Sequence, residues 1–134
     1  MNKPTDFSKF GKAFQESLAH LIMNQRAFAD QIREVLSIDF FELKYLQVFV
    51  DKVLKHKDKY GVHPSKDAML AILRTELDEE NSTTQKQTRD FFARIYKSEI
   101  EIGGEEYIKE TSLDFCRKQK LKEAMIKSVK LSRA

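Results

Sequence analysis

Three stripes of apolar residues, separated by two short polar breaks, lie between residues 14 and 54 and constrain the fold more than any other feature. Each stripe repeats at intervals of three and four residues, the spacing that places side chains on one face of an α-helix. The stripes consist of Phe14, Leu18, Leu21 and Ile22, then Phe28, Ile32, Val35 and Leu36, then Leu43, Leu46, Phe49, Val50, Val53 and Leu54. Because no one helix can bury its own stripe, we expect three helices that fold back on one another.

Capping residues and glycines predict where the helices begin and end. We expect Asn24 to cap the second helix through its side-chain oxygen, and Gly61 to close a third helix that runs from about residue 41 to residue 60. We expect Ser65 to cap a fourth helix and the Ser-Thr-Thr run at 82–84 to cap a fifth. The buried residues expected on these two helices are Met69, Leu70, Ile72, Leu73 and Leu77, and then Thr88, Phe91, Phe92 and Ile95.

The segment that follows Gly103 and Gly104 contains no glycine or proline and predicts one long final helix, to about residue 132. A helix of about 28 residues is about 40 Å long and would project beyond a head of five short helices. Its apolar residues are sparse, and we expect an exposed stripe that mediates self-association, with Phe115 as its anchor. The stripe consists of Phe115, Leu121, Met125 and Val129. The alternative is that the helix folds back and buries the stripe within one chain.

Composition favours an all-α fold, a compact bundle of about five short helices followed by the long projecting helix. The 134 residues include four glycines and two prolines, whereas helix-forming residues such as Leu, Ala, Glu, Lys and Gln are plentiful. A chain of this length can bury about two-thirds of the surface that it exposes when unfolded, so it needs no disulfide or metal. The single cysteine, Cys116, is interpreted as a packing residue. With no disulfide framework and no apolar signal or membrane segment, we expect a cytoplasmic protein.

The sequence predicts three segments, of which the last carries an excess of basic residues. We expect a flexible amino-terminal arm over residues 1–12, a helical head over 13–102 and a long basic helix over 103–134. Seven of the 24 basic residues but one of the 21 acidic residues fall in 117–134, so the first 116 residues carry 17 basic and 20 acidic side chains. Candidates for contact with nucleic-acid phosphates are Arg117, Lys118, Lys120, Lys122 and Lys127. An ordinary solvated helix face is the favoured alternative, because no aromatic residue that could stack on a base follows Phe115.

No pattern in the sequence indicates catalysis or cofactor binding. A P-loop needs glycines ahead of a Lys and a Ser or Thr, and none of the four glycines begins such a pattern. His20, His56 and His63 lack the spacing of zinc ligands, and we interpret them as one packing histidine and two exposed ones. The three acids at 78–80 are interpreted as a solvated turn. We therefore expect no catalytic residue, no cofactor and no metal site in this chain.

The order of these features resembles the amino-terminal domain of DnaB-type replicative DNA helicases, most of all the branch found in T-even-type phages. In that family a first helix ending in Leu-x-x-Leu-Ile is followed by a polar break, an acidic-aromatic turn, a long helix and a Pro-Ser or Pro-Thr cap. The matching residues here are Asn24, Gln25 and Phe28 at the break, Asp39, Phe40 and Phe41 at the turn, and Pro64 and Ser65 at the cap. Residues 106–129 are similar to the helix that leaves the head and begins a projecting hairpin.

The resemblance implies an assembly role. Members of the family are hexamers in which the amino-terminal domains form a collar, paired through the helical hairpin, on which primase docks. ATP and magnesium belong to a separate motor domain that this sequence lacks, so we expect the chain to be a non-enzymatic segment of a longer helicase. The implied partners are other copies of the chain, a primase and, as a further candidate, a helicase loader, with only weak or indirect DNA contact. The implied setting is a bacterial cell, with a phage as one source of the gene.

Two other classes of protein remain open. The helicase-binding domain of a primase resembles the same fold, but it ends its chain, whereas a collar domain begins one. Met1, followed by a short polar arm, favours the collar. The third class is a free-standing basic adaptor that binds nucleic acid through its tail, and it would show strong, steeply salt-dependent binding to single-stranded DNA.

Overall fold

The computed structural model describes residues 5–97 and 104–133, with side chains as far as residue 130, and is helical throughout. In chain order its elements are η1 (Phe7–Phe10), α1 (Gly11–Asn24), α2 (Arg26–Arg33), η2 (Ile38–Phe40), α3 (Lys44–Tyr60), α4 (Lys66–Thr75), α5 (Ser82–Tyr96) and α6 (Glu105–Arg133). The two η elements are short 3-10 helices, and the described residues include no strand. The predicted all-α fold is confirmed, and so is the long final helix.

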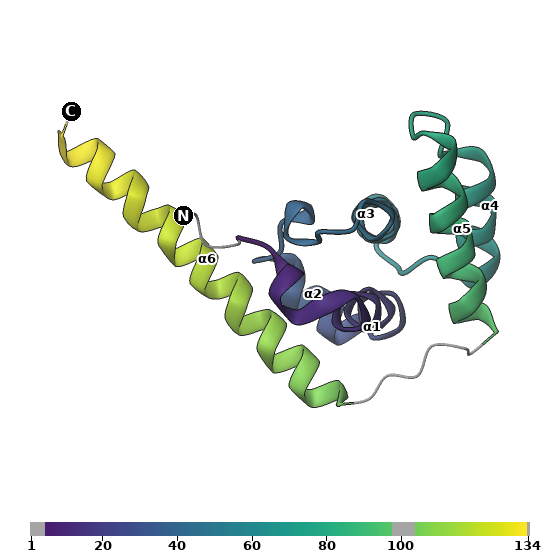
Figure 1. The fold of residues 1–134 in the computed structure, drawn as a ribbon, viewed down its shortest axis with the longest axis horizontal. Helices are drawn as coiled ribbons and strands as arrows, with labels where there is room; N and C mark the ends of the chain where they lie inside the picture. Colours follow the sequence, from purple (N-terminus) through teal and green to yellow (C-terminus); the bar gives the residue numbers. More distant parts are fainter. Residues whose placement is uncertain (1–4, 98–103, 134) are drawn as a thin grey trace.

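Helix α1 lies at the centre of the head and packs against η1, α2, α3 and α6. Eight of its residues between Phe14 and Ile22 are buried, so nearly its whole circumference is covered. Figure 1 shows α4 and α5 side by side at one end of the head, with α6 running past the opposite side and continuing beyond it. The head therefore presents two distinct regions, an α4–α5 pair and a projecting helix.

The predicted apolar stripes account for most of the core. In the first three stripes nearly every residue is buried, although Val35, Leu36 and Leu43 are only partly so. All four residues predicted on α5 are buried. On α4 the prediction is too broad, because Leu70 is exposed and Ile72 is only partly buried. Helix α4 packs mainly against α5, so its far side faces solvent.

Two of the predicted helix signals are confirmed. Gly61 closes α3 with φ +75° and donates its N–H to the carbonyl oxygen of Lys57. The Ser65 hydroxyl oxygen caps α4 by accepting the N–H of Ala68 at 3.1 Å.

Three other predicted boundaries are wrong. Asn24 is the last residue of α1 and not a cap, since Gln25 separates the two helices. The cap of α5 is Asn81, whose side-chain oxygen accepts the N–H of Thr84 at 2.8 Å, so the helix starts with the run that was expected to cap it. Helix α3 starts at Lys44, because residues 38–40 form η2 and Phe41 turns into the core.

The predicted flexible arm is wrong for the residues that form η1. Asp6 caps this short helix by accepting the N–H of Ser8 at 2.9 Å. Phe7 is completely buried, with its ring centroid 5.3 Å from that of Phe41 and 5.0 Å from that of Phe115. An aromatic side chain that finds such a site gains enough from burial to order the backbone around it. Residues 1–4 of the expected arm lie outside the described residues.

A polar cluster inside the head joins α1, α3 and α5. The buried carboxylate of Glu16 accepts two hydrogen bonds from Arg94, at 3.1 and 2.5 Å, and one from the Tyr45 hydroxyl at 2.8 Å. Burial acts to raise the pKa of Glu16, but the hydrogen bonds from Arg94 and Tyr45 outweigh it, so the pKa lies below its ordinary value of 4.5. Burial and the hydrogen bond to Glu16 raise the pKa of Tyr45. The carboxylate is therefore held in its charged form.

Truncating the core at Leu21 tests this packing. Leu21 is 1% exposed, so we expect Leu21→Ala to lower the free energy of unfolding by about 2–5 kcal/mol through lost burial and a residual cavity. Leu70→Ala is the matched control at a site that is 36% exposed, and should cost about 0.5 kcal/mol or less. Urea denaturation followed by circular dichroism measures both. Equal shifts in the two variants would contradict the packing described here.

Removing the guanidinium of Arg94 tests the polar cluster. At pH 7 Arg94→Gln leaves the Glu16 carboxylate without its charged partner. We expect the free energy of unfolding to fall by about 1–3 kcal/mol. Because the folded pKa of Glu16 is depressed, its contribution is present above the ordinary value of 4.5 and is lost as the pH falls through the folded pKa. The difference in the free energy of unfolding between Arg94→Gln and the wild type should therefore become smaller below pH 4.5. Arg74→Gln, on the exposed side of α4, is the control, and a gap that stays constant with pH would contradict the assignment.

Candidate interaction surfaces

Helix α6 divides into a part that packs on the head and a part that leaves it. In the first part Ile108, Ser112 and Cys116 are buried at intervals of four residues, which is the period of one helix face. Gln25 donates a side-chain hydrogen bond to Glu105 at the start of the helix. Lys120 is the last described anchor, since its ammonium donates to the carbonyl oxygen of Glu34 at 2.6 Å.

The predicted interface stripe is split by this division. Phe115 was expected to be its exposed anchor, and that expectation is wrong: the side chain is 6% exposed and lies among Phe7, Phe10 and Phe40. The centroid of its ring is 5.4 Å from that of Phe40. Phe115 points toward the head because the aromatic residues of η1 and η2, which are distant in sequence, form a pocket for it.

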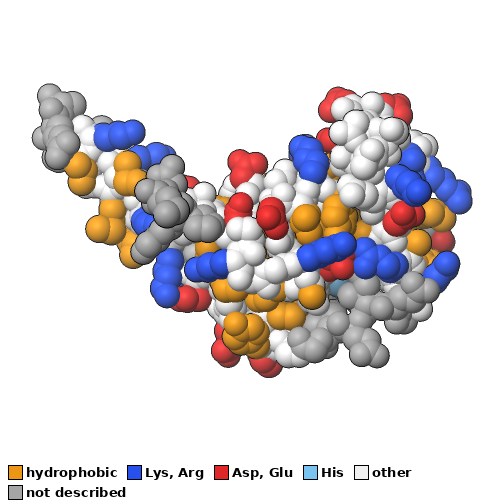
Figure 2. Space-filling model, viewed as in Figure 1, with side chains coloured by type: hydrophobic (Ala, Val, Ile, Leu, Met, Phe, Trp, Pro, Cys, Tyr) orange, Lys and Arg blue, Asp and Glu red, His pale blue; other side chains and the backbone are white. Residues whose placement is uncertain are grey.

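The other predicted stripe residues lie on what we call the α6 extension, residues 121–130, all of which are exposed. Leu121, Met125 and Val129 are 62%, 61% and 49% exposed. Ile126, which the sequence interpretation left out, is 54% exposed. At 100° per residue these four side chains cover an arc of about 140°. Figure 2 shows hydrophobic and basic side chains next to one another on this projecting part of the molecule.

The five basic residues predicted to contact nucleic acid differ in their surroundings. Lys118 pairs with Asp114 at 2.9 Å, and Lys120 donates to the head. Arg117, Lys122 and Lys127 are exposed. Lys122 lies inside the apolar arc, between Val129 and Ile126 around the helix. The structure therefore gathers these cations along a helix rather than around a pocket.

Unlike the charged Glu16–Arg94 pair, the cysteine and two of the histidines are neutral packing residues of the head. Burial raises the pKa of the Cys116 thiol to about 12, which agrees with its interpretation as a packing residue. Burial also lowers the pKa of His20 and of His63, so both imidazoles are uncharged at neutral pH. His63 is only partly exposed, because its Nε2 contacts the carbonyl oxygen of Ile22 at 2.9 Å.

The described residues include no group of three or more His, Cys, Asp or Glu side chains arranged to hold a metal ion. Likewise, none of the helices in the described part of the chain combines the length and apolar character needed to cross a membrane. The expected absence of a cofactor stays a prediction.

Two grooves were not predicted from the sequence, because each is formed by residues of two different helices. The groove between α4 and α5 has a volume of about 240 Å³ and is lined by large apolar side chains, among them Leu70, Phe92 and Tyr96. The groove between α3 and α4 is larger, about 550 Å³, and one of its walls is basic. A signal for the second groove does exist in the sequence. Ala68 and Ala71, small residues three positions apart, leave room on one face of α4.

Comparison with protein-family models, with curated proteins and with solved structures gave no match. The fold and its surfaces define an all-helical head with a projecting, partly apolar and basic helix. The resemblance to the collar domains of replicative helicases therefore stays a hypothesis that rests on the order of the sequence features.

Proposed function

We propose that this chain is the amino-terminal collar domain of a hexameric replicative DNA helicase of the DnaB type, where it assembles subunits and docks a primase. The observation that carries the proposal is the α6 extension, which leaves a well-packed head with four large apolar side chains about half or more exposed. The order of sequence features over residues 14–129 supports the same role. On this proposal the complete reading frame encodes a P-loop motor domain beyond this segment.

The exposure of the α6 extension in a single chain is the physical argument for a partner. All ten residues of the extension are exposed, so burial against the head adds little to the stability of this part of the helix. Pairing with a second extension would bury the apolar arc formed by Leu121, Met125 and Ile126. This burial would stabilise the helical conformation of the extension. An extension of this length spans about 15 Å, so the contact it offers is small and suits an assembly held at several points.

Charge sets the salt dependence of this contact. The extension carries Lys122, Lys127 and Lys130 against the single acid Glu123, so two copies repel each other electrostatically. Salt screens that repulsion and leaves the apolar contact intact. We therefore infer that self-association strengthens as the salt concentration rises, whereas binding of a nucleic acid to the same cations would weaken.

Sedimentation velocity tests the assembly role. We expect the wild-type chain to form dimers or larger species as its concentration rises, and Met125→Glu and Leu121→Glu to be monomers with unchanged helical content, because a charge forced into an apolar contact is costly. Ala124→Glu introduces the same charge on the other side of the helix and should still associate. A wild-type chain that stays monomeric at every concentration and salt, or Ala124→Glu failing like Met125→Glu, would contradict the proposal.

The proposal also predicts that the purified chain hydrolyses no ATP, since none of its glycines begins a phosphate-binding loop. A coupled phosphate-release assay measures this, with a known ATPase as the positive control. ATPase activity that co-elutes with the protein in two different chromatographic steps would contradict the prediction.

A further inference from the structure

The groove between α3 and α4 combines cations, an exposed tyrosine next to a partly buried histidine, and a wall of aliphatic residues, two of them small. Helix α3 contributes Lys52, Lys55, His56, Lys59 and Tyr60 to one wall. Helix α4 contributes Ala68, Ala71 and Ile72 to the other wall, and Glu76, directly after the helix, is the charged residue on that side. We propose that this groove binds single-stranded nucleic acid, with a base on the tyrosine ring and phosphates along the lysines. This goes beyond the collar role, for which the family resemblance implies only weak or indirect contact with DNA.

The aromatic part of the site is built at the end of α3. Tyr60 is the last residue of the helix, and the left-handed turn at Gly61 directs the chain away, which leaves the ring 59% exposed. The His56 ring lies one turn earlier, 4.7 Å away between centroids. The ammonium of Lys59 lies over the tyrosine ring, 5.3 Å from its centroid. An exposed ring with a cation beside it suits the stacking of a base next to its own phosphate.

The lysines form a row along the same face of α3. Lys52, Lys55 and Lys59 are spaced by three and four residues, so they extend over about 10 Å of the helix. Among the charged residues that line the groove, only Glu76 opposes these three cations. The balance of charge favours an anionic ligand, and the row of single charges matches a chain of phosphates.

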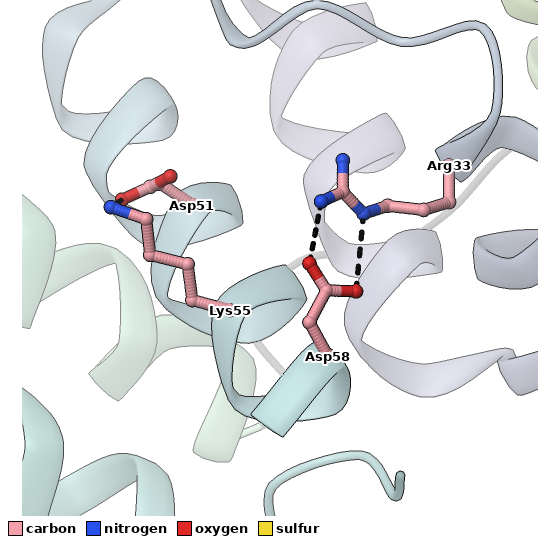
Figure 3. A network of polar contacts seen from close by, with 4 residues as sticks. All are labelled: Arg33, Asp51, Lys55 and Asp58. Atoms are coloured by element: carbon pink, nitrogen blue, oxygen red, sulfur yellow. Dashed lines mark hydrogen bonds and ion pairs between the residues drawn. The ribbon is translucent and has the colours of Figure 1, made fainter. Parts of the chain in front are cut away.

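The acids of α3 do not cancel this row. Figure 3 shows Asp58 engaged by Arg33 of α2, with nitrogen–oxygen distances of 2.5 and 3.4 Å, and Lys55 paired with Asp51 at 3.0 Å within α3. The Lys55 side chain is still 72% exposed and open to exchange its partner. Within the described part of the chain no ion pair engages Lys52 or Lys59.

The shape of the groove favours nucleic acid over an acidic peptide. A docked amphipathic helix needs a deep apolar groove for its large side chains. The α4–α5 groove is the more apolar of the two and is lined by large side chains, among them Leu70 and Phe92. Of the four aliphatic residues that line the α3–α4 groove, Ala68 and Ala71 are small and Val62 and Ile72 are larger, and the facing wall is basic. A flat base can lie between the aliphatic wall and an aromatic ring without filling a deep pocket.

A tryptophan reporter tests the stacking. The chain contains no tryptophan, so Tyr60→Trp places a single fluorophore in the groove. We expect oligothymidylate of about 12 nucleotides to quench it saturably. Tyr96→Trp is the matched control, because Tyr96 is also exposed, at 54%, and also has a lysine ammonium over its ring, but lies on α5 outside this groove. Quenching absent at position 60, or equal at both positions, would overturn the proposal.

Anisotropy of a labelled oligothymidylate measures the affinity. Tyr60→Ala should weaken binding roughly 5- to 100-fold, and Tyr60→Trp should retain it. Lys52→Gln with Lys55→Gln should lower the salt slope by about 1.4, as expected for two lost phosphate contacts. Lys122→Gln with Lys127→Gln removes the same charge from the α6 extension and should change affinity by less than about 2-fold, while circular dichroism confirms that each variant is folded.

Three results would overturn the proposal. The first is the absence of measurable binding at low salt. The second is loss of binding in the α6 variant with binding intact in the groove variants, which would place the nucleic acid on the basic tail. The third is polyglutamate competing as well as unlabelled oligothymidylate, which would show a site for acidic peptides. None of these outcomes depends on self-association through the α6 extension, so this proposal and the collar role can fail separately.

Discussion

The packing of Phe115 against the amino-terminal aromatic residues fixes how the two regions of the molecule are arranged. Phe7, Phe40 and Phe115 come from η1, η2 and α6, and their ring centroids lie 5.0–6.0 Å apart. Such contacts add about 0.5–1.5 kcal/mol each beyond the area that they bury. They hold the first part of α6 against η1 and η2, next to α1, and the direction of a rigid helix then determines where its extension lies. Together with the buried face of α6 and the Lys120–Glu34 hydrogen bond, this cluster sets the orientation of the projecting surface relative to the head.

The polar cluster around Glu16 provides directional contacts on the other side of α1. A buried carboxylate is unfavourable unless it is paired, and here it receives hydrogen bonds from Arg94 of α5 and Tyr45 of α3. Apolar packing alone tolerates small shifts of one helix along another, whereas these hydrogen bonds have narrow geometric limits. Helix α1 is thus held by aromatic contacts toward α6 and by a charged cluster toward α5.

The two proposed surfaces use different chemistry and lie on different helices. The α6 extension is an apolar arc that includes one lysine, Lys122, which suits a small contact repeated in an assembly. The α3–α4 groove is a basic, partly aromatic channel next to small residues. In a collar of several copies, each copy would bring one such groove, so weak contacts with a single strand would add through multivalency. The α4–α5 groove adds an apolar surface, and it shares α4 with the α3–α4 groove.

The sequence by itself determined the helices and most of the core, because amphipathic periodicity is a local property that each segment carries: Leu18, Ile32 and Phe49, one from each stripe, are all buried. It also located the exposed side chains at Leu121, Met125 and Val129. Only the tertiary structure decided that Phe7 and Phe115 meet in the core, since their contact joins residues far apart in the chain and no periodicity encodes it. The same holds for the Glu16–Arg94 pair and for the α3–α4 groove, whose walls face each other because the turn at Gly61 brings two helices together. Local patterns predict which face of a helix is apolar, but which neighbour covers that face depends on the packing of the whole chain.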